Sequence, residues 1–286
     1  MAKTRTILAL SIVAVFLGLA LFAPLISPYD PFQGGSDALK TPGTAGHLMG
    51  TNHIGQDIAT QVIYGARVSL AVGVAAALSA SLLGTLIGSL AGFFGGWVDG
   101  LLMRFSEFFQ VLPRFVLALV IVAFFGSGVF KLILVLAILS WPQTARLARA
   151  QILSLRESTF VEAARLSGMK PLTIIVREIL PNALAPIVIV GSLDIASAIL
   201  LEASLSFFGL GDPNQISWGL MLNYAQAYLR QGWWMALFPG LWHDPARDNC
   251  RHCATGTARC PILVTHDSVD RRPGADAAQP RPDAGA

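Results

Sequence analysis

Charged residues are scarce in this chain of 286 residues. Lys, Arg, Asp and Glu make up 13% of it, about half the usual quarter of a soluble domain. Hydrophobic residues make up 54% and the mean hydropathy is +0.60. So few charges cannot cover the surface of a water-soluble protein of this size, and the composition therefore predicts a membrane protein. The net charge of +3 is small, so no nucleic-acid partner is expected.

Cysteine is missing from residues 1–249, so no disulfide framework holds the main body together. The phosphate-binding pattern G-x-x-x-x-G-K-[ST] is also missing, which predicts that the chain binds no nucleotide or other cofactor itself. The apolar segments contain no ordered set of catalytic residues. A membrane-embedded enzyme is the alternative that these two observations disfavour.

Long apolar stretches are what the chain does have. A helix needs roughly 20 apolar residues to cross the hydrocarbon layer. The candidates are residues 7–26, 68–94, 111–129, 132–141 with an extension to about 147, and 183–211. The first stretch has a rival interpretation as a signal peptide, but its length and the missing A-x-A site favour a retained helix.

Basic residues test this assignment, because Lys and Arg concentrate in cytoplasmic loops. Lys3 and Arg5 lie at the N-terminus, and the region between the fourth and fifth stretches is rich in arginine. Since an even number of crossings separates the two regions, both are expected on the cytoplasmic side. Residues 27–66 and 212–232 are then expected to face outward.

A charged segment interrupts the apolar sequence before the fifth stretch. Thr159 and Glu162 fit a capping box, which predicts a short helix over residues 160–167. Gly168 suits the left-handed position that ends a helix. Pro171 suits the first turn of a second helix. This second helix is expected to reach about residue 180, with Pro181 at a turn into the fifth stretch.

The small side chains of Ala163 and Ala164 would let a partner surface approach this helix closely. Glu162 and Arg165 would add polar contacts at its edges. These properties are typical of a docking element. From the residues alone, an amphipathic loop lying on the membrane remains an equal alternative.

A family resemblance favours docking. Glu162-Ala163-Ala164, then three residues, then Gly168, with Leu180-Pro181 downstream, resembles the EAA loop of permease subunits in bacterial ABC importers. Glu178 departs from the pattern, which often has Ile there. Residues 47–70, 198–222 and 233–241 are similar to the dipeptide/oligopeptide/nickel permeases, and specifically to the second of their two permease subunits.

The resemblance implies an all-α, polytopic membrane bundle with five complete spans and a truncated sixth. Residues 1–66 would form the N-terminal membrane helix and outward loop. Residues 67–242 would form the permease domain with its coupling loop at about 150–181. Residues 243–286 would form an aberrant, disordered tail.

The resemblance also implies partners. The coupling loop would dock on cytoplasmic ATP-binding subunits, which use the ATP, through residues Glu162, Ala163, Ala164, Gly168, Leu180 and Pro181. A second permease subunit, a periplasmic substrate-binding protein and membrane lipid would complete the surroundings, at the bacterial inner membrane. Peptides are the expected cargo, with nickel or glutathione as alternatives. A stand-alone channel or secondary transporter would not need a docking helix.

Two carboxylates lie within the fifth apolar stretch, where ionisable groups are costly and face a cavity or a partner. Asp194 and Glu202 are therefore candidates for lining the translocation path, with helix packing as the alternative. His47, His53 and Asp57 lack compact ligand spacing, so a structural role beside the second stretch is favoured over a metal site.

The tail departs from the family after about residue 241. Apolar continuity stops, and Cys250, Cys253 and Cys260 appear together with arginine and proline. A shifted reading frame is the favoured interpretation, and an inactive permease would be one result. A zinc site is the alternative, although a second pair of ligands is missing.

Overall fold

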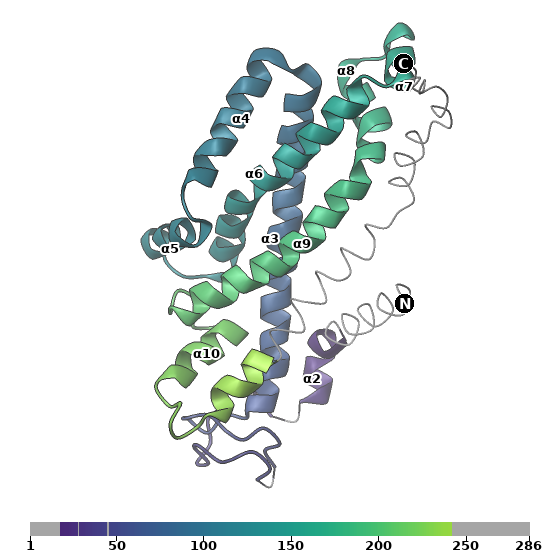
Figure 1. Cartoon of the computed structure of the whole chain (residues 1–286). Coiled ribbons are helices and arrows are strands. Elements are labelled where there is room, and N and C mark those ends of the chain that lie inside the picture. The colour runs from purple at the N-terminus through teal and green to yellow at the C-terminus, as the bar shows by residue number, and fades with distance from the viewer. Residues whose placement is uncertain (1–17, 28, 45, 242–286) are drawn as a thin grey trace, which may run out of the picture.

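The protein is described here by a computed structural model, which covers residues 18–27, 29–44 and 46–241. Within these residues the fold is helical, with two isolated β-bridges and no strand. Three helices define an elongated bundle: α3 (Ile58–Phe94), α6 (Val129–Arg156) and α9 (Leu180–Phe207) (Figure 1). The predicted all-α class is confirmed for this part of the chain.

Three helices are long and apolar enough to cross a membrane: α3, α6 and the continuous helix Pro171–Phe207, which contains α9. They correspond to the predicted second, fourth and fifth stretches, with different bounds. α3 begins before residue 68 because Asp57 caps it, accepting hydrogen bonds of 2.8 Å from both the amide and the hydroxyl of Thr60. α6 continues to Arg156 although Pro142 lies inside it.

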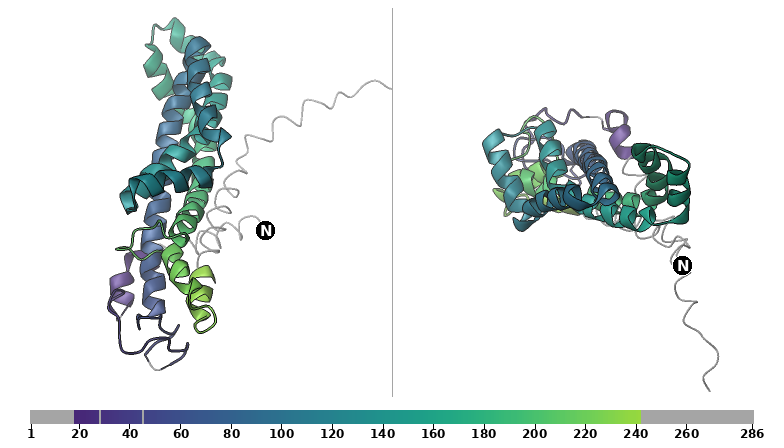
Figure 2. Two further views of the ribbon diagram at one scale, coloured as in Figure 1. Left: turned by 90° about the vertical axis from the view of Figure 1, so that its left-hand side faces the viewer. Right: turned by 90° about the horizontal axis from the view of Figure 1, so that it is seen from above.

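The third predicted stretch, residues 111–129, is not one straight helix. The chain instead forms α4 (Gly96–Val111) and α5 (Arg114–Phe125), which meet at an angle of 86°. Pro113 explains the break, because its ring has no amide to donate and restricts the residue before it. α5 therefore lies across the long axis of the bundle (Figure 2). Only as a bent pair do α4 and α5 pass the length and hydropathy test for a span.

The first predicted stretch lies mostly outside the described residues; the short helix α2 (Ala23–Ile26) belongs to its end. Residues 234–241 are helical and lie where the truncated sixth span is predicted. The proposed tail, residues 243–286, lies outside the described residues. Five complete spans with a truncated sixth therefore remain a prediction.

Close contact between α3 and α6 depends on three glycines spaced four residues apart in α3. A Cβ atom built on Gly84 would lie 2.7 Å from the Trp141 oxygen, and one on Gly92 would lie 2.9 Å from the Arg149 oxygen. At Gly88 the distance to the Ala145 oxygen would be 2.3 Å. Small residues let helix backbones approach in this way where lipid provides no hydrophobic drive for association.

The two ends of the bundle differ. At one end, here called the α10 end, residues 29–57 and α10 (Trp218–Gln226) pack with the start of α3 (Figure 1). Trp218 is completely buried there, and Trp234 donates a 3.1 Å hydrogen bond to the Thr51 carbonyl. The two segments expected on one side of the membrane, 27–66 and 212–232, are thus found at one end of the molecule.

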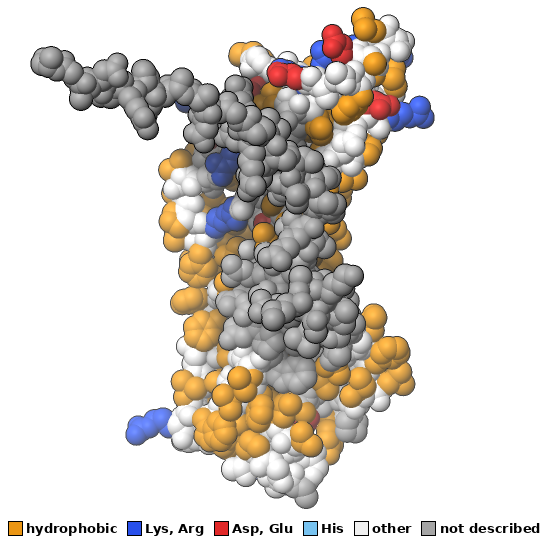
Figure 3. All heavy atoms as spheres, turned by 45° about the vertical axis from the view of Figure 1, so that its right-hand side comes forward, with side chains coloured by type: hydrophobic (Ala, Val, Ile, Leu, Met, Phe, Trp, Pro, Cys, Tyr) orange, Lys and Arg blue, Asp and Glu red, His pale blue; other side chains and the backbone are white. Residues whose placement is uncertain are grey.

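At the opposite end, here called the α7 end, lie α7 (Thr159–Leu166) and α8 (Pro171–Ile174). On the face shown in Figure 3, charged side chains of both signs gather at this end, and hydrophobic side chains are visible along the edges of the flank below it. An apolar flank with a charged end is the distribution expected of a membrane bundle with one solvated loop region.

Candidate functional site

The predicted short helix before the fifth stretch is present as α7, and Gly168 ends it as expected. Gly168 has a φ of +76°, in the left-handed region. Its amide donates to the Arg165 carbonyl (3.0 Å), and the Met169 amide donates to the Ala164 carbonyl (3.2 Å). These two bonds form a Schellman motif, which satisfies the last carbonyls of the helix and fixes the direction of the chain that leaves it.

The predicted capping box is wrong. The N-cap of α7 is Ser158, and its side chain does not cap the helix. α6 ends at Arg156, two residues before Ser158. The Ser158 hydroxyl therefore donates to the Leu155 carbonyl in the last turn of α6, at 2.5 Å, and not to an amide of α7. Glu162 therefore keeps an exposed carboxylate that has no hydrogen bond with any described residue.

α7 packs on the bundle through one side. Val161 is completely buried and Ala164 is 8% exposed, both in a cluster with Ile152, Ile174 and Ile179. Glu162, Ala163 and Arg165 are exposed. The expectation that both alanines face a partner needs correction for Ala164, whose methyl group lies against the chain's own core. The outer surface of the motif consists of Glu162 and Ala163.

The predicted turn at Pro181 is also wrong. α8, a π-helical turn over Ile175–Ile179 and α9 form one continuous helix, with Pro181 in the first turn of α9. The π turn accommodates the proline, because the Leu180 amide donates to the carbonyl five residues back, on Ile175. The Asn182 side chain donates to the Glu178 carbonyl (2.7 Å) in the same turn. Leu180 and Pro181 thus lie within the continuous helix that follows α7 and not at a turn between two helices.

α7 is also tied to the end of α3, through contacts that sequence reasoning missed. The Arg165 guanidinium lies 5.4 Å from the centre of the Phe93 ring, a cation–π distance. Arg156 donates to the last carbonyls of α3, on Gly92 (3.4 Å) and Phe93 (3.3 Å). A cavity of about 500 Å³ lies between these groups and Glu162. No local sequence signal pairs residues so far apart in the chain.

A partly buried ion pair connects α6 to α4. Arg149 Nε and a second guanidinium nitrogen each donate to one oxygen of Asp99 at 2.5 Å. This two-pronged geometry is the strong form of an arginine–carboxylate contact. At the α7 end, these contacts therefore connect α7 to α3, α3 to α6, and α6 to α4.

The two path candidates lie between helices. Asp194 is 4% exposed and accepts a 3.1 Å hydrogen bond from Thr144 of α6. Glu202 is 1% exposed and accepts from Ser69 of α3 (3.0 Å) and from Ser206 (2.7 Å). These contacts correspond to the packing alternative, and a path role for either carboxylate stays a prediction.

Glu202 offers a way to separate the two roles. Glu202→Leu would strand the Ser69 and Ser206 hydroxyls at a cost of about 1–3 kcal/mol for each buried unsatisfied group. We expect a lower midpoint of thermal unfolding in detergent. In Glu202→Gln the amide oxygen can still accept from one serine hydroxyl and the amide nitrogen can donate to the other, so its midpoint should stay near that of the unmodified chain. Strongly reduced transport by a stable Glu202→Gln protein would instead indicate a path role.

The histidines expected beside the second stretch lie apart. His47 Nδ1 contacts Asp57, the N-cap of α3, at 3.0 Å. His53 stacks on Tyr228, with ring centroids 4.7 Å apart. Among the residues that the structure describes, no group of three or more His, Cys, Asp or Glu side chains is arranged to hold a metal ion.

Comparison with known proteins places these features in a family. Residues 84–242 match the family described as "Binding-protein-dependent transport system inner membrane component". The chain is 38% identical over 229 residues to the di/tripeptide transport system permease protein DppC of Pseudomonas aeruginosa, covering 78% of this chain and 76% of that one.

Two further relatives are similar to the same extent. The dipeptide transport system permease protein DppC of Escherichia coli K12 is 40% identical over 242 residues, covering 82% of this chain and 81% of the relative. The glutathione transport system permease protein GsiD of Shigella flexneri is 41% identical over 243 residues, covering 84% and 79%. The described helices, the motif-bearing α7 and these similarities agree: the chain belongs to the family of binding-protein-dependent transport system inner membrane components, the permease subunits of such transporters.

Proposed function

We propose that this chain is a permease subunit of an ABC importer for peptides, and that α7 is the element on which a partner ATPase acts. The observation that carries the proposal is the construction of α7. It exposes Glu162 and Ala163 outward, buries Val161 inward and is followed, after the turn at Gly168, by a helix long and apolar enough to cross a membrane. If a partner protein displaces a helix built like α7, the displacement is transmitted to the membrane bundle.

The mechanism that we infer is mechanical. Two ATP-binding subunits would close on ATP and displace α7, and the chain itself would bind no cofactor. Because α7 is braced to Phe93 of α3 and to the helix that contains α9, its displacement would move these helices together. Rigid-body rocking against a second permease subunit would then open the path to one side at a time.

The partners and cargo follow from the family and from the names of relatives. The relatives are named for dipeptide and glutathione transport, which supports peptides as the cargo class; nickel is the alternative on the same scaffold. A substrate-binding protein would deliver the peptide at the α10 end. The α7 end and the N-terminus would lie in the cytoplasm of a bacterial inner membrane, as the basic residues near α7 indicate.

Cross-linking from Ala163 tests the docking. In a chain whose native cysteines are replaced by serine, Ala163→Cys is expected to cross-link to the ATP-binding subunit of the assembled complex, because its side chain lies on the outer face of α7. Gln231→Cys is the matched control: it is equally exposed but at the α10 end, and should capture no ATPase. Cross-links from Gln231→Cys alone would overturn the proposed orientation.

Charge reversal at Glu162 tests the coupling. The exposed carboxylate has no partner among the described residues, so Glu162→Lys should leave insertion and the fold unchanged. We expect uptake to fall at least about tenfold, since a hydrogen bond to a charged group contributes roughly 1.5–3 kcal/mol. Glu157→Lys is the control within the same loop: Glu157 is also exposed, lies outside the Glu162-Ala163-Ala164 motif and makes only a 3.9 Å ion pair with Arg156 among the described residues. Normal ATP-driven peptide uptake by Glu162→Lys would contradict the role of α7.

A further inference from the structure

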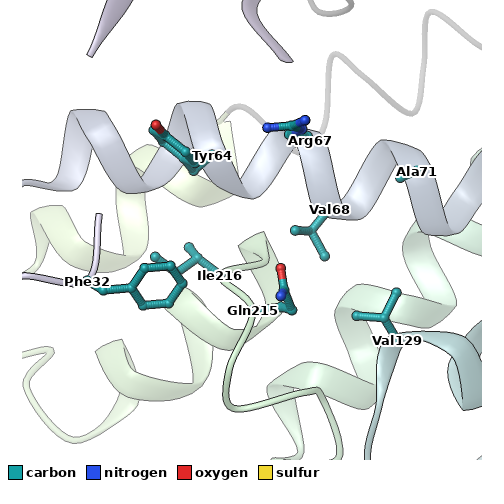
Figure 4. Close-up of a pocket in the computed structure, with 8 residues that line it drawn as sticks. All are labelled: Phe32, Tyr64, Arg67, Val68, Ala71, Val129, Gln215 and Ile216. Atoms are coloured by element: carbon teal, nitrogen blue, oxygen red, sulfur yellow. The ribbon is translucent and has the colours of Figure 1, made fainter. Parts of the chain in front are cut away.

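A cavity of about 510 Å³ opens on α3 near the α10 end, away from the coupling segment. Its walls come from α3, from the loop before α10, from the segment before α3 and from the first residue of α6 (Figure 4). Its lining combines three polar side chains with five apolar ones, namely Tyr64, Arg67 and Gln215 with Phe32, Val68, Ala71, Val129 and Ile216. An apolar enclosure with a few convergent polar groups is the usual form of a small-molecule site.

Arg67 is the only charged residue in this lining. Its side chain is exposed, and it forms no hydrogen bond or ion pair with any residue that the structure describes. The Asp212 carboxylate accepts hydrogen bonds from the Val129 amide (3.4 Å) and the Asn214 amide (3.0 Å) and forms no ion pair with Arg67. The guanidinium in the cavity lining is therefore unpaired among the residues that the structure describes.

Two neutral polar groups accompany this charge. Figure 4 shows the Arg67 guanidinium extending along α3 toward the Tyr64 side chain, one turn earlier, and the Gln215 amide directed from the opposite wall toward α3. The backbone of Gln215 is held by its amide, which donates to the Asp212 carbonyl at 3.1 Å, while its side chain is exposed. The phenol and the amide both have hydrogens to donate beside the guanidinium.

This chemistry selects a carboxylate. A guanidinium has a planar arrangement of donors that matches both oxygens of a carboxylate, and the tyrosine and glutamine donors would complete its hydrogen bonds. A peptide carries one free α-carboxylate at its C-terminus, and its side chains would find the apolar walls formed by Phe32 and Ile216. The α10 end is where cargo would enter under the proposed function.

We propose that Arg67, with Tyr64 and Gln215, binds the free α-carboxylate of a peptide during its entry into the translocation path. This inference rests on the proposed function, because it names a subsite for the cargo of that importer. An acidic side chain of the second permease subunit is the competing occupant of the same charge, and the experiment below separates the two.

The test uses the complete importer in proteoliposomes, with trialanine and trialanine amide each supplied on the system's own binding protein. The unmodified complex should transport trialanine in preference to its amide. We expect Arg67→Gln to reduce trialanine uptake about tenfold to a hundredfold, the range set by losing a charge-assisted hydrogen bond of roughly 1.5–3 kcal/mol. It should also remove the preference for the free acid. Arg67→Lys keeps the charge without the planar donors, so its trialanine uptake should lie between that of the unmodified complex and that of Arg67→Gln.

Arg230→Gln is the matched control. Arg230 is another exposed arginine near the α10 end, it lies outside the cavity lining, and its replacement should leave uptake and preference unchanged. Co-purification with the second permease subunit is measured for each variant. If Arg67→Gln still prefers trialanine to its amide as strongly as the unmodified complex does, the proposal is overturned. Loss of the second permease subunit from the Arg67→Gln complex would also overturn it, because it would assign Arg67 to the interface between the subunits. Absence of any ATP-driven peptide uptake by the unmodified complex would instead refute the proposed function.

Discussion

Gly168→Pro is expected to abolish ATP-driven uptake while the chain still inserts into the membrane. Proline fixes φ near −65° and has no amide hydrogen, whereas Gly168 has a φ of +76° and donates to the Arg165 carbonyl. The Schellman motif would therefore be lost, and α7 would leave its seat on Ile174 and Ile179. Backbone strain at this position and the lost hydrogen bond together cost about 3 kcal/mol, which corresponds to a loss of roughly a hundredfold in the coupled state.

Two substitutions at the same position serve as controls. Gly168→Asn should retain most uptake, because asparagine tolerates the left-handed region. Gly168→Ala should be intermediate, since a Cβ atom at this position meets no atom within 4 Å and only the backbone strain remains. Uptake by the membrane-inserted proline variant at the level of the asparagine variant would show that the geometry of α7 does not matter for coupling.

Gly88→Val is expected to prevent stable packing of α3 against α6. The added Cβ atom would lie 2.3 Å from the Ala145 oxygen and 2.8 Å from the Ala148 Cβ. The first of these contacts is with backbone, which cannot rotate away, so the helices must separate along their whole contact. Overpacking costs roughly 1–3 kcal/mol and sometimes more; the upper end is expected here. Thermal unfolding of the detergent-solubilised protein measures it.

Gly100→Val is the control for this prediction. Gly100 lies in α4, and a Cβ atom there would meet nothing within 4 Å. The same change of residue type should therefore leave the unfolding midpoint nearly unchanged. Equal midpoints for both variants would mean that the glycines of α3 do not set its distance from α6.

Local sequence signals predicted the local structure of α7 well. Gly168 and Pro171 act through their own backbone preferences, so the end of one helix and the start of the next could be inferred without any tertiary contact. Ser158 shows the limit of such signals: Thr159 matched a capping pattern, but the hydroxyl before it was engaged by the preceding helix. Which residue caps the start of α7 therefore depends on where the preceding helix, α6, ends.

The candidate site depends on contacts that a linear pattern does not contain. Arg156 was visible only as one basic residue among several, whereas in the fold it binds the end of α3. Glu202 was expected near the path because a carboxylate in an apolar stretch is costly, yet hydroxyls from α3 and α9 satisfy it. The charge predicted that a partner must exist; only the fold identifies that partner. The same holds for Arg67, whose cavity combines segments far apart in the chain.

The π-helical turn at Ile175–Ile179 has a consequence for changes of chain length. Such a turn contains one residue more than an α-helical turn, and the surplus is absorbed locally. Removing a single residue there, such as the exposed Val176, would keep the same inward faces on both sides, at the cost of placing Pro181 in an ordinary α-helical turn. Removing one residue further along α9 would instead rotate everything beyond it by about 100°, given 3.6 residues per turn, and would turn Asp194 away from Thr144. We therefore expect a one-residue deletion in the Pro171–Phe207 helix to be tolerated best at this short turn.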